Sequence, residues 1–203
     1  MMNKKGMVVC FLVIVITVSF ISSAIAADWR FPVALTYISG WSDVKDLYED
    51  NLDTEGYSYE EVSGLPVGLS FQPYVELDKG FAVGGGVGPL MLILGDWDFF
   101  DLPLRMDFRY IVMPQNDTAA YFRIGPSFHL ASGDYVESDG AGIFVGAGVE
   151  FLRTRRVGMG IELAYDSAEV EFKRSRRDYW GSIYTEKEKI KPCEFMFSVF
   201  AIF

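Results

Sequence analysis

The sequence predicts an all-β fold: an eight-stranded antiparallel up-and-down transmembrane β-barrel, preceded by an N-terminal signal peptide. Three observations lead to this prediction. Residues 102–112 alternate apolar side chains with Arg105, Asp107 and Arg109, and a period of two indicates a strand. Beyond the N-terminal segment no apolar run is long enough for a spanning helix, so any membrane crossing must be made by closed strands. The links between the expected strands alternate between short and longer, which is typical of outer-membrane barrels.

The N-terminal segment has the three parts of a secretory signal peptide. Lys4 and Lys5 precede an apolar run that begins at Met7, and Ala24 and Ala26 provide small residues for cleavage. A membrane anchor helix is the alternative, but the apolar run is short for a span. We therefore expect a signal peptide at residues 1–26 and one barrel domain at residues 27–203.

Composition excludes several function classes. Removing Lys4 and Lys5 with the signal peptide takes the formal net charge from −10 to −12, which argues against a nucleic-acid partner. Cys193 is then the one remaining cysteine, so the sequence predicts no internal disulfide and no cysteine metal cluster. No metal site and no cofactor are predicted.

The alternation of apolar and polar residues continues along the whole mature chain. Phe31, Val33, Leu35 and Tyr37 mark the first strand, and the same pattern recurs seven times. The expected strands are residues 31–40, 65–77, 81–91, 102–112, 121–130, 142–151, 157–166 and 193–203.

The links fall into two classes. The short ones are turns at residues 78–80, 114–117 and 153–156. The longer ones are an acidic segment at 41–63 with one or two helical turns, a loop near 95–100, a polar loop at 132–140 and a charged hairpin at 169–191. With an even number of strands, every short link lies at the barrel end that carries both termini. Short links on one side and longer ones on the other indicate periplasmic turns and outer loops.

The face opposite the apolar one is expected to fill the barrel interior. Many of its positions are glycines, which relieve crowding in a barrel of this size. The other inner positions are charged or polar, and buried charges must be paired, so we expect a salt-bridged interior without a wide channel. The expected interior charges are Glu76, Arg105, Asp107, Arg109, Arg123, Glu150, Glu162 and Asp166.

Residues 143–151, the basic turn after them, and residues 157–165 with Glu162 and Tyr165 resemble the closing hairpins of the OmpA-type and OmpX-type eight-stranded outer-membrane barrels. The alternating C-terminal residues resemble the signal that the outer-membrane assembly machinery recognises in that group: Phe195, Phe197, Val199 and Phe203. The resemblance implies the outer membrane of a Gram-negative bacterium, with its lipids and that machinery as partners. One departure is the apolar inner face of the last strand, at Phe200 and Ile202.

A basic cluster on the last hairpin is a candidate contact for lipopolysaccharide phosphates, because Arg offers forked donors and aromatic residues nearby suit an interface. Its members are Lys173, Arg174, Arg176 and Arg177. The alternative is a solvated hairpin with charges of both signs.

Two other motifs are weaker. His129, the only histidine, has Ser127 near it, and a family of eight-stranded lipid A deacylases uses a serine two residues after the histidine, where this chain has Ala131. Residues 51–62 match the first positions of a calcium loop through Asn51 and Asp53, but Val62 stands where a glutamate is needed.

The leading functional hypothesis is a non-enzymatic outer-membrane barrel with a structural, adhesive or surface-interaction role, acting through outer loops 41–63 and 169–191. A barrel hydrolase acting on lipid A is a second hypothesis. A soluble periplasmic lipocalin-like barrel, with its apolar faces inward around a hydrophobic ligand, is a third. A small pore is a further hypothesis, and it requires the inner charges to line an open, water-filled path through the barrel.

Overall fold

The structure is a computed structural model that describes residues 28–57, 62, 64–93 and 98–203. The expected signal peptide at residues 1–26 lies outside the described residues. The elements are β1 (Asp28–Arg30), β2 (Pro32–Ile38), α2 (Trp41–Glu55), β3 (Val67–Phe71), β4 (Tyr74–Glu76), the short helix η1 (Asp78–Gly80), β5 (Phe81–Val87), β6 (Met91–Ile93), β7 (Phe99–Val112), β8 (Ala119–Gly133), β9 (Val136–Phe151), β10 (Gly158–Asp166), β11 (Glu169–Arg177), β12 (Ile183–Ile190) and β13 (Phe195–Ile202). None of the helices in the described part of the chain combines the length and the apolar character needed to cross a bilayer.

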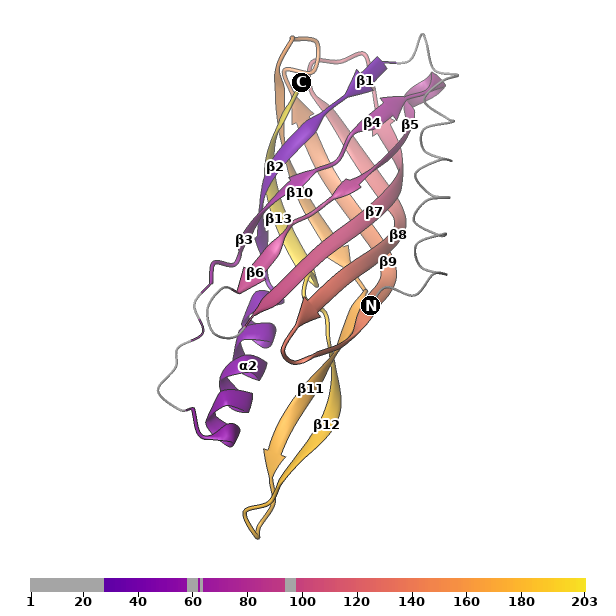
Figure 1. Cartoon of the computed structure of the whole chain (residues 1–203). Coiled ribbons are helices and arrows are strands. Elements are labelled where there is room, and N and C mark those ends of the chain that lie inside the picture. The colour runs from indigo at the N-terminus through magenta and orange to yellow at the C-terminus, as the bar shows by residue number, and fades with distance from the viewer. Residues whose placement is uncertain (1–27, 58–61, 63, 94–97) are drawn as a thin grey trace.

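The strands close into a barrel with eight antiparallel positions around its wall, which we call staves; a stave consists of one strand or of two that follow each other (Figure 1). Going round, the order is β2, β3, β5, β7, β8, β9, β10 and β13, and β13 pairs with β2 again. The shorter strands β1, β4 and β6 continue the staves of β2, β3 and β5. Closure removes the free sheet edges that a lipid environment cannot satisfy. The predicted eight-stranded up-and-down barrel is confirmed.

The apolar files point outward. On neighbouring staves Leu35 pairs with Val199 and Leu69, and all three side chains are exposed. The residues between them, such as Thr36 and Ser198, are buried inside. The lipocalin-like alternative requires Arg105, Asp107 and Arg109 to lie outside and the apolar strand faces to point inward. The three charged side chains are buried and the apolar faces are exposed, so that alternative is wrong.

Glycines on the inner face make room for aromatic rings. A Cβ at Gly160 would clash with the ring of Phe200, and one at Gly148 would lie 2.6 Å from the ring of Tyr121. Both rings are buried in an apolar cluster at one end of the interior. The apolar inner positions of the last strand, Phe200 and Ile202, belong to this cluster, so glycine spacing and aromatic filling are matched.

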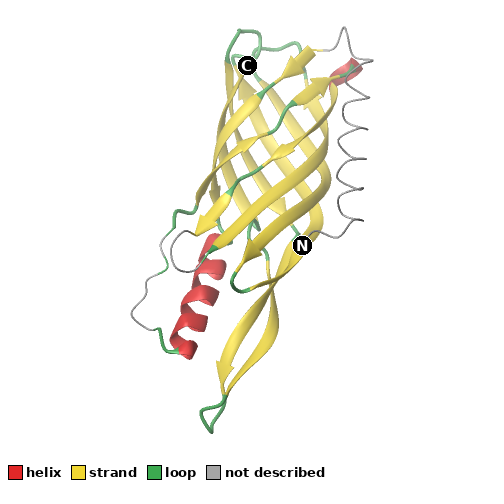
Figure 2. Cartoon of the chain, viewed as in Figure 1, coloured by secondary structure: helices red, strands yellow, loops and turns green. Residues whose placement is uncertain are grey.

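The two ends of the barrel differ, as Figure 2 shows. The end with the C-terminus carries the turns at 78–80, 113–118 and 152–157. The other end carries α2 and the β11–β12 hairpin, which extends well beyond the barrel rim. We refer to it as the outer end, because longer connections face outward in barrels of this kind.

Two expectations about the outer end are wrong. The acidic segment 41–63 contains a fifteen-residue helix, α2, and not one or two turns. Its buried side chains, spaced three or four residues apart, pack on the barrel mouth and on β11. The polar loop expected at 132–140 is mostly strand, since β8 runs to Gly133 and β9 starts at Val136. Its polar composition marks strands that continue past the apolar belt, not a loop.

The apolar belt gives a stability prediction. Leu35→Arg places a charge at mid-height on the outer face and should destabilise the barrel in lipid bilayers by about 2–4 kcal/mol, the cost of a lipid-facing Arg near the midplane. The measurement is the urea midpoint of folding into lipid vesicles, with the folded fraction read from heat-modifiable migration on a gel. The control is Ile183→Arg on the β12 hairpin, which should leave the midpoint unchanged. Equal midpoints for both variants would contradict an outward lipid-facing belt.

Candidate functional site

The barrel interior holds paired charges, which we call the interior network. Arg105 Nη2 lies 2.9 Å from Asp166, and Arg109 Nη1 lies 3.1 Å from Glu150. Both pairs are almost fully buried. The network consists of Arg105, Asp107, Arg109, Arg123, Glu150, Arg153, Glu162 and Asp166, with Glu76 partly buried at its edge. The structure thus places all the expected interior charges inside the barrel and gives each an oppositely charged partner.

Aromatic rings hold the guanidinium groups in place. The Arg109 guanidinium lies between the rings of Tyr74 and Tyr121, 4.0 and 4.5 Å from their centroids. The ring of Phe144 is 4.6 Å from the guanidinium carbon of Arg105 and 4.3 Å from that of Arg123. Cation–π contacts of this kind are stronger when water is excluded. The interior is therefore fixed by stacking as well as by ion pairs.

Little free space remains among these side chains. A cavity lined by Arg109, Tyr121, Arg123 and Glu162 has a volume of about 20 Å³. Such a volume admits about one water molecule. The interior near these residues is a packed plug and not an open file of charges.

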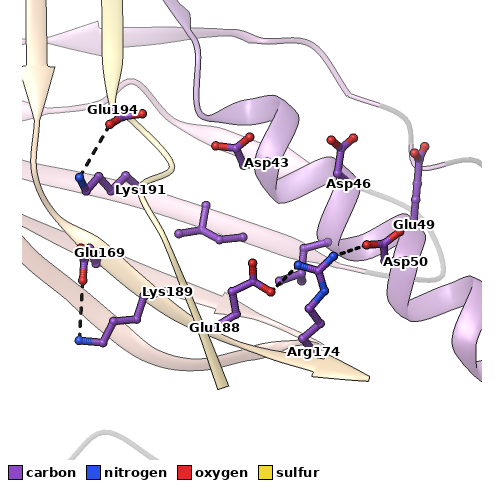
Figure 3. A pocket seen from close by; sticks show the side chains of 12 residues that line it. Asp43, Asp46, Glu49, Asp50, Glu169, Arg174, Glu188, Lys189, Lys191 and Glu194 are labelled. Carbon is purple, nitrogen blue, oxygen red and sulfur yellow. Dashed lines mark hydrogen bonds and ion pairs between the residues drawn. The ribbon is translucent and has the colours of Figure 1, made fainter. Parts of the chain in front are cut away.

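The outer end carries a larger cavity between α2 and the β11–β12 hairpin (Figure 3). This acidic groove has a volume of about 560 Å³. Its charged lining consists of Asp43, Asp46, Glu49, Asp50, Glu169, Glu188 and Glu194 against Arg174, Lys189 and Lys191. Ion pairs join each of the three cations to a carboxylate, as the dashed lines in Figure 3 show. Asp43 and Asp46 form no ion pair among the described residues, so the groove presents excess negative charge.

The basic cluster of the hairpin is paired along its length. Arg174 contacts Asp50 and Glu188, and Arg176 contacts Glu186. Lys173 lies 3.1 Å from Glu137, and Arg177 donates a 2.6 Å hydrogen bond to the carbonyl of Thr54. The hairpin has charges of both signs facing one another across its strands. The lipopolysaccharide contact at these residues stays a prediction.

Helix α2 docks on β11 through one buried amide. Asn51 Nδ2 donates to the carbonyl of Lys173 at 2.8 Å, and Asn51 Oδ1 accepts from the backbone N–H of Ser175 at 2.7 Å. The side chain thereby completes the strand edge of β11 as a neighbouring strand would. Because residues 51–55 are helical and Asn51 is used in this way, they do not form the calcium loop that the sequence pattern suggested.

Tyr48 fixes the same helix over the barrel mouth. Its hydroxyl donates to the carbonyl of Asp98 at 3.0 Å, and its ring packs edge-on against Tyr135 and Phe99. Burial raises the pKa of Tyr48 well above its usual range, so the hydroxyl stays protonated and remains a donor. The helix is therefore a fixed wall of the groove.

His129 is fully buried inside the barrel near the outer end. Its Nδ1 lies 2.8 Å from Asp101, and its Nε2 lies 3.4 Å from Asp166. Ser127 donates its hydroxyl to Asp166 at 2.6 Å and not to the imidazole. A serine nucleophile needs the histidine as its base, so Ser127 and His129 do not form that pair here.

Three of the residues named for assembly lie on the outer face of β13, and Phe203 follows directly after the strand. Phe195, Phe197, Val199 and Phe203 are all exposed, as alternate residues of a strand should be. Recognition by assembly machinery stays a prediction.

Three contributors were missed from the sequence. Arg153 was expected in a turn, yet its side chain returns into the barrel to contact Glu76 and Glu150. Asp101 lies before residues 102–112, where the strand was expected. Tyr74 was expected on the inner face, but the sequence does not predict that its hydroxyl donates to Glu150 at 2.9 Å. A strand period indicates which face a residue occupies, but not the reach of a long turn side chain.

The docking of α2 can be tested at Asn51. Asn51→Ala leaves the buried N–H of Ser175 without an acceptor, so it should make the docking of α2 less favourable by about 1–3 kcal/mol. Amide hydrogen exchange at residues 41–55 and at Ser175 should accelerate. The matched control, Asn116→Ala in an exposed turn, should leave exchange there unchanged. Protection equal to that of the unmodified protein would show that this amide does not hold the helix.

The interior network predicts a larger effect from an isosteric change. Glu150→Gln removes the charge that faces Arg109 and Arg153 and should destabilise the barrel by about 3 kcal/mol, because buried cations lose their partner. Urea unfolding in lipid vesicles measures the change. Glu186→Gln, in an exposed ion pair with Arg176, should cost less than about 1 kcal/mol. Equal costs would mean that the interior charges are solvated.

Comparisons with protein-family models and with curated proteins find no match for this chain. Among solved structures, the fold is similar to outer membrane protein OprG from Pseudomonas aeruginosa, with a TM-score of 0.56, 10% sequence identity, and coverage of 87% of this chain and 95% of that chain. Neisserial surface protein A (NspA) matches with a TM-score of 0.45 and 13% identity, covering 87% and 97%. A major outer membrane protein from Thermus thermophilus matches with a TM-score of 0.42 and 13% identity, covering 86% and 98%. The first likeness and the closed topology together show that the chain has the eight-stranded β-barrel fold of outer-membrane proteins.

Proposed function

We propose that this protein is a non-enzymatic barrel of the outer membrane of a Gram-negative bacterium that engages a cationic partner at the cell surface. The apolar belt supports a location in the outer membrane, because a closed barrel with apolar outer faces is stable in a lipid bilayer. The OprG-like fold supports the same location. The acidic groove between α2 and the β11–β12 hairpin is the observation that carries the surface role.

The interior supports a structural role for the barrel itself. Paired charges and stacked rings fill it, and the cavity beside Arg123 holds about 20 Å³. A wide aqueous path would need those pairs to separate. The barrel therefore serves as the membrane anchor, and the parts that protrude into solvent make the contacts.

The groove fits a cationic partner because of its charge and its rigidity. Among the described side chains, Asp43 and Asp46 on α2 lack ion-pair partners, and Glu49 pairs only with Lys45 on the same helix. The wall that carries them is fixed by Asn51 and Tyr48, so little ordering cost accompanies binding. Opposite charge on a rigid surface favours association and its rate.

The experiment is binding of a fluorescent lysine-rich peptide to the barrel in detergent, followed by anisotropy at low and high salt. The variant Asp43→Asn, Asp46→Asn, Glu49→Gln should weaken binding about tenfold, if each of three exposed charges contributes about 0.5 kcal/mol. High salt should weaken binding to the unmodified protein more than to the variant.

The control removes the same number of charges outside the groove. Glu137, Glu171 and Glu186, each changed to Gln, give an equal change in net charge, and none of them lines the groove. Their variant should keep most of the affinity. Equal losses in the two variants would mean that the peptide responds to net charge and that the groove is not the site.

Lipopolysaccharide is a further partner proposed for the hairpin, through Lys173, Arg174, Arg176 and Arg177. Their acidic partners lie across the strands of the same hairpin or nearby, so a phosphate would have to compete with carboxylates. The groove variant should leave lipopolysaccharide binding unchanged, which separates this contact from that of the cationic peptide.

A further inference from the structure

Three possible metal ligands from distant parts of the chain meet inside the barrel near its outer end. They are Asp101 on β7, His129 on β8 and Cys193 in the turn before β13. One ligand atom from each lies within 4.8 Å of the other two, and all three residues are buried. A carboxylate oxygen, an imidazole nitrogen and a thiol sulfur are the donors that Zn²⁺ takes in proteins.

One atom of this cluster has no partner within the described part of the chain. Asp101 Oδ1 is buried and accepts no hydrogen bond from any described residue, although Oδ2 lies 2.8 Å from His129 Nδ1. Asp101 itself is fully buried. A buried carboxylate oxygen without a donor is uncommon and unfavourable. This oxygen lies in a cluster whose thiol and imidazole can bind the same cation as the carboxylate.

We propose that Asp101, His129 and Cys193 form a binding site for a divalent transition-metal ion of the Zn²⁺ class. The ion would lie between His129 Nδ1, the carboxylate of Asp101 and the thiolate of Cys193. It takes the place of the proton between Nδ1 and Asp101, and it gives Oδ1 a partner. Two protons leave on binding, one from the thiol and one from Nδ1.

The surroundings fit a ligated histidine. Asp166 Oδ2 lies 3.4 Å from His129 Nε2, on the side of the ring away from Asp101. Metal-bound imidazoles usually donate their other N–H to a carboxylate, which fixes the ring. Asp166 is held in turn by Arg105 and Ser127. Asp166 is therefore a positioning residue for the site and not a ligand.

The charges of the site also balance. A divalent ion is neutralised by the Asp101 carboxylate and the Cys193 thiolate, while Arg105 is neutralised by Asp166. The sulfur of Met91 lies 3.9 Å from Cys193 Sγ, so a second soft atom borders the cluster. Ca²⁺ and Mg²⁺ prefer all-oxygen sites, and a thiolate with an imidazole selects against them.

The test is refolding of the detergent-extracted barrel with Co²⁺ as a spectroscopic probe. We expect about one equivalent of Co²⁺ per chain, with the thiolate-to-cobalt charge-transfer absorption that only a cysteine ligand gives. Zn²⁺ should displace the Co²⁺, and an excess of Mg²⁺ should not. A refolded barrel with normal heat-modifiable migration but no thiolate absorption would overturn the proposal.

Variants locate the ion. Cys193→Ser should abolish the charge-transfer absorption, and Asp101→Asn should weaken Co²⁺ binding at least tenfold, in proteins whose migration shows that they fold. The triple variant of Asp43, Asp46 and Glu49 should keep the full absorption. If Co²⁺ binding were lost in that variant and kept in Cys193→Ser, the ion would be in the acidic groove and the proposal would be wrong. If the interior variants fail to fold, the spectrum of the unmodified protein decides alone.

Discussion

The structure depends on one constraint: a barrel with apolar outer faces must place its polar residues inside, and the charges there must neutralise one another. Arg105 and Arg109 on β7 are almost fully shielded from solvent, so each requires a carboxylate within contact distance. Asp166 and Glu150 provide them from β10 and β9. Phe144 and the two tyrosines around Arg109 then fill the remaining space with rings on which guanidinium groups stack. Strand register, glycine spacing and ion pairing are consequently parts of the same packing problem.

This constraint explains how much of the fold could be predicted from the sequence. A period of two assigns residues to a face, and the faces of Arg105, Asp107 and Arg109 follow from it directly. The number of strands and the difference between the two ends follow from the same alternation and from the lengths of the links. Pairing could not be predicted, because partners such as Glu150 lie on other strands and their contact depends on register and side-chain reach. Arg153 shows the limit best, since a turn residue contributes to the interior.

The outer end was predicted less well because its signals overlap. The apolar positions of α2, Trp41, Val44, Tyr48 and Leu52, have helical spacing, but the acidic residues between them make the segment resemble a solvated loop. Asn51 is polar and yet fully buried, which only the nearby edge of β11 explains. Polar residues at 132–140 belong to strands that extend beyond the apolar belt, so polarity there reflects the solvent around the strands and not the absence of strand structure.

Charge pairing also distinguishes the interior network, the acidic groove and the surroundings of Asp101. Within the interior network every carboxylate has a cationic partner, so the network fixes the barrel and leaves little free charge for a ligand. In the acidic groove Asp43 and Asp46 remain unpaired in the described structure, and water can solvate them until a cation replaces it. Asp101 combines both situations, because it is buried like the network and yet has an oxygen that no described residue contacts as a donor. Burial and an oxygen without a donor both make a carboxylate costly, and at Asp101 the donor atoms of His129 and Cys193 lie close enough to share a cation with it.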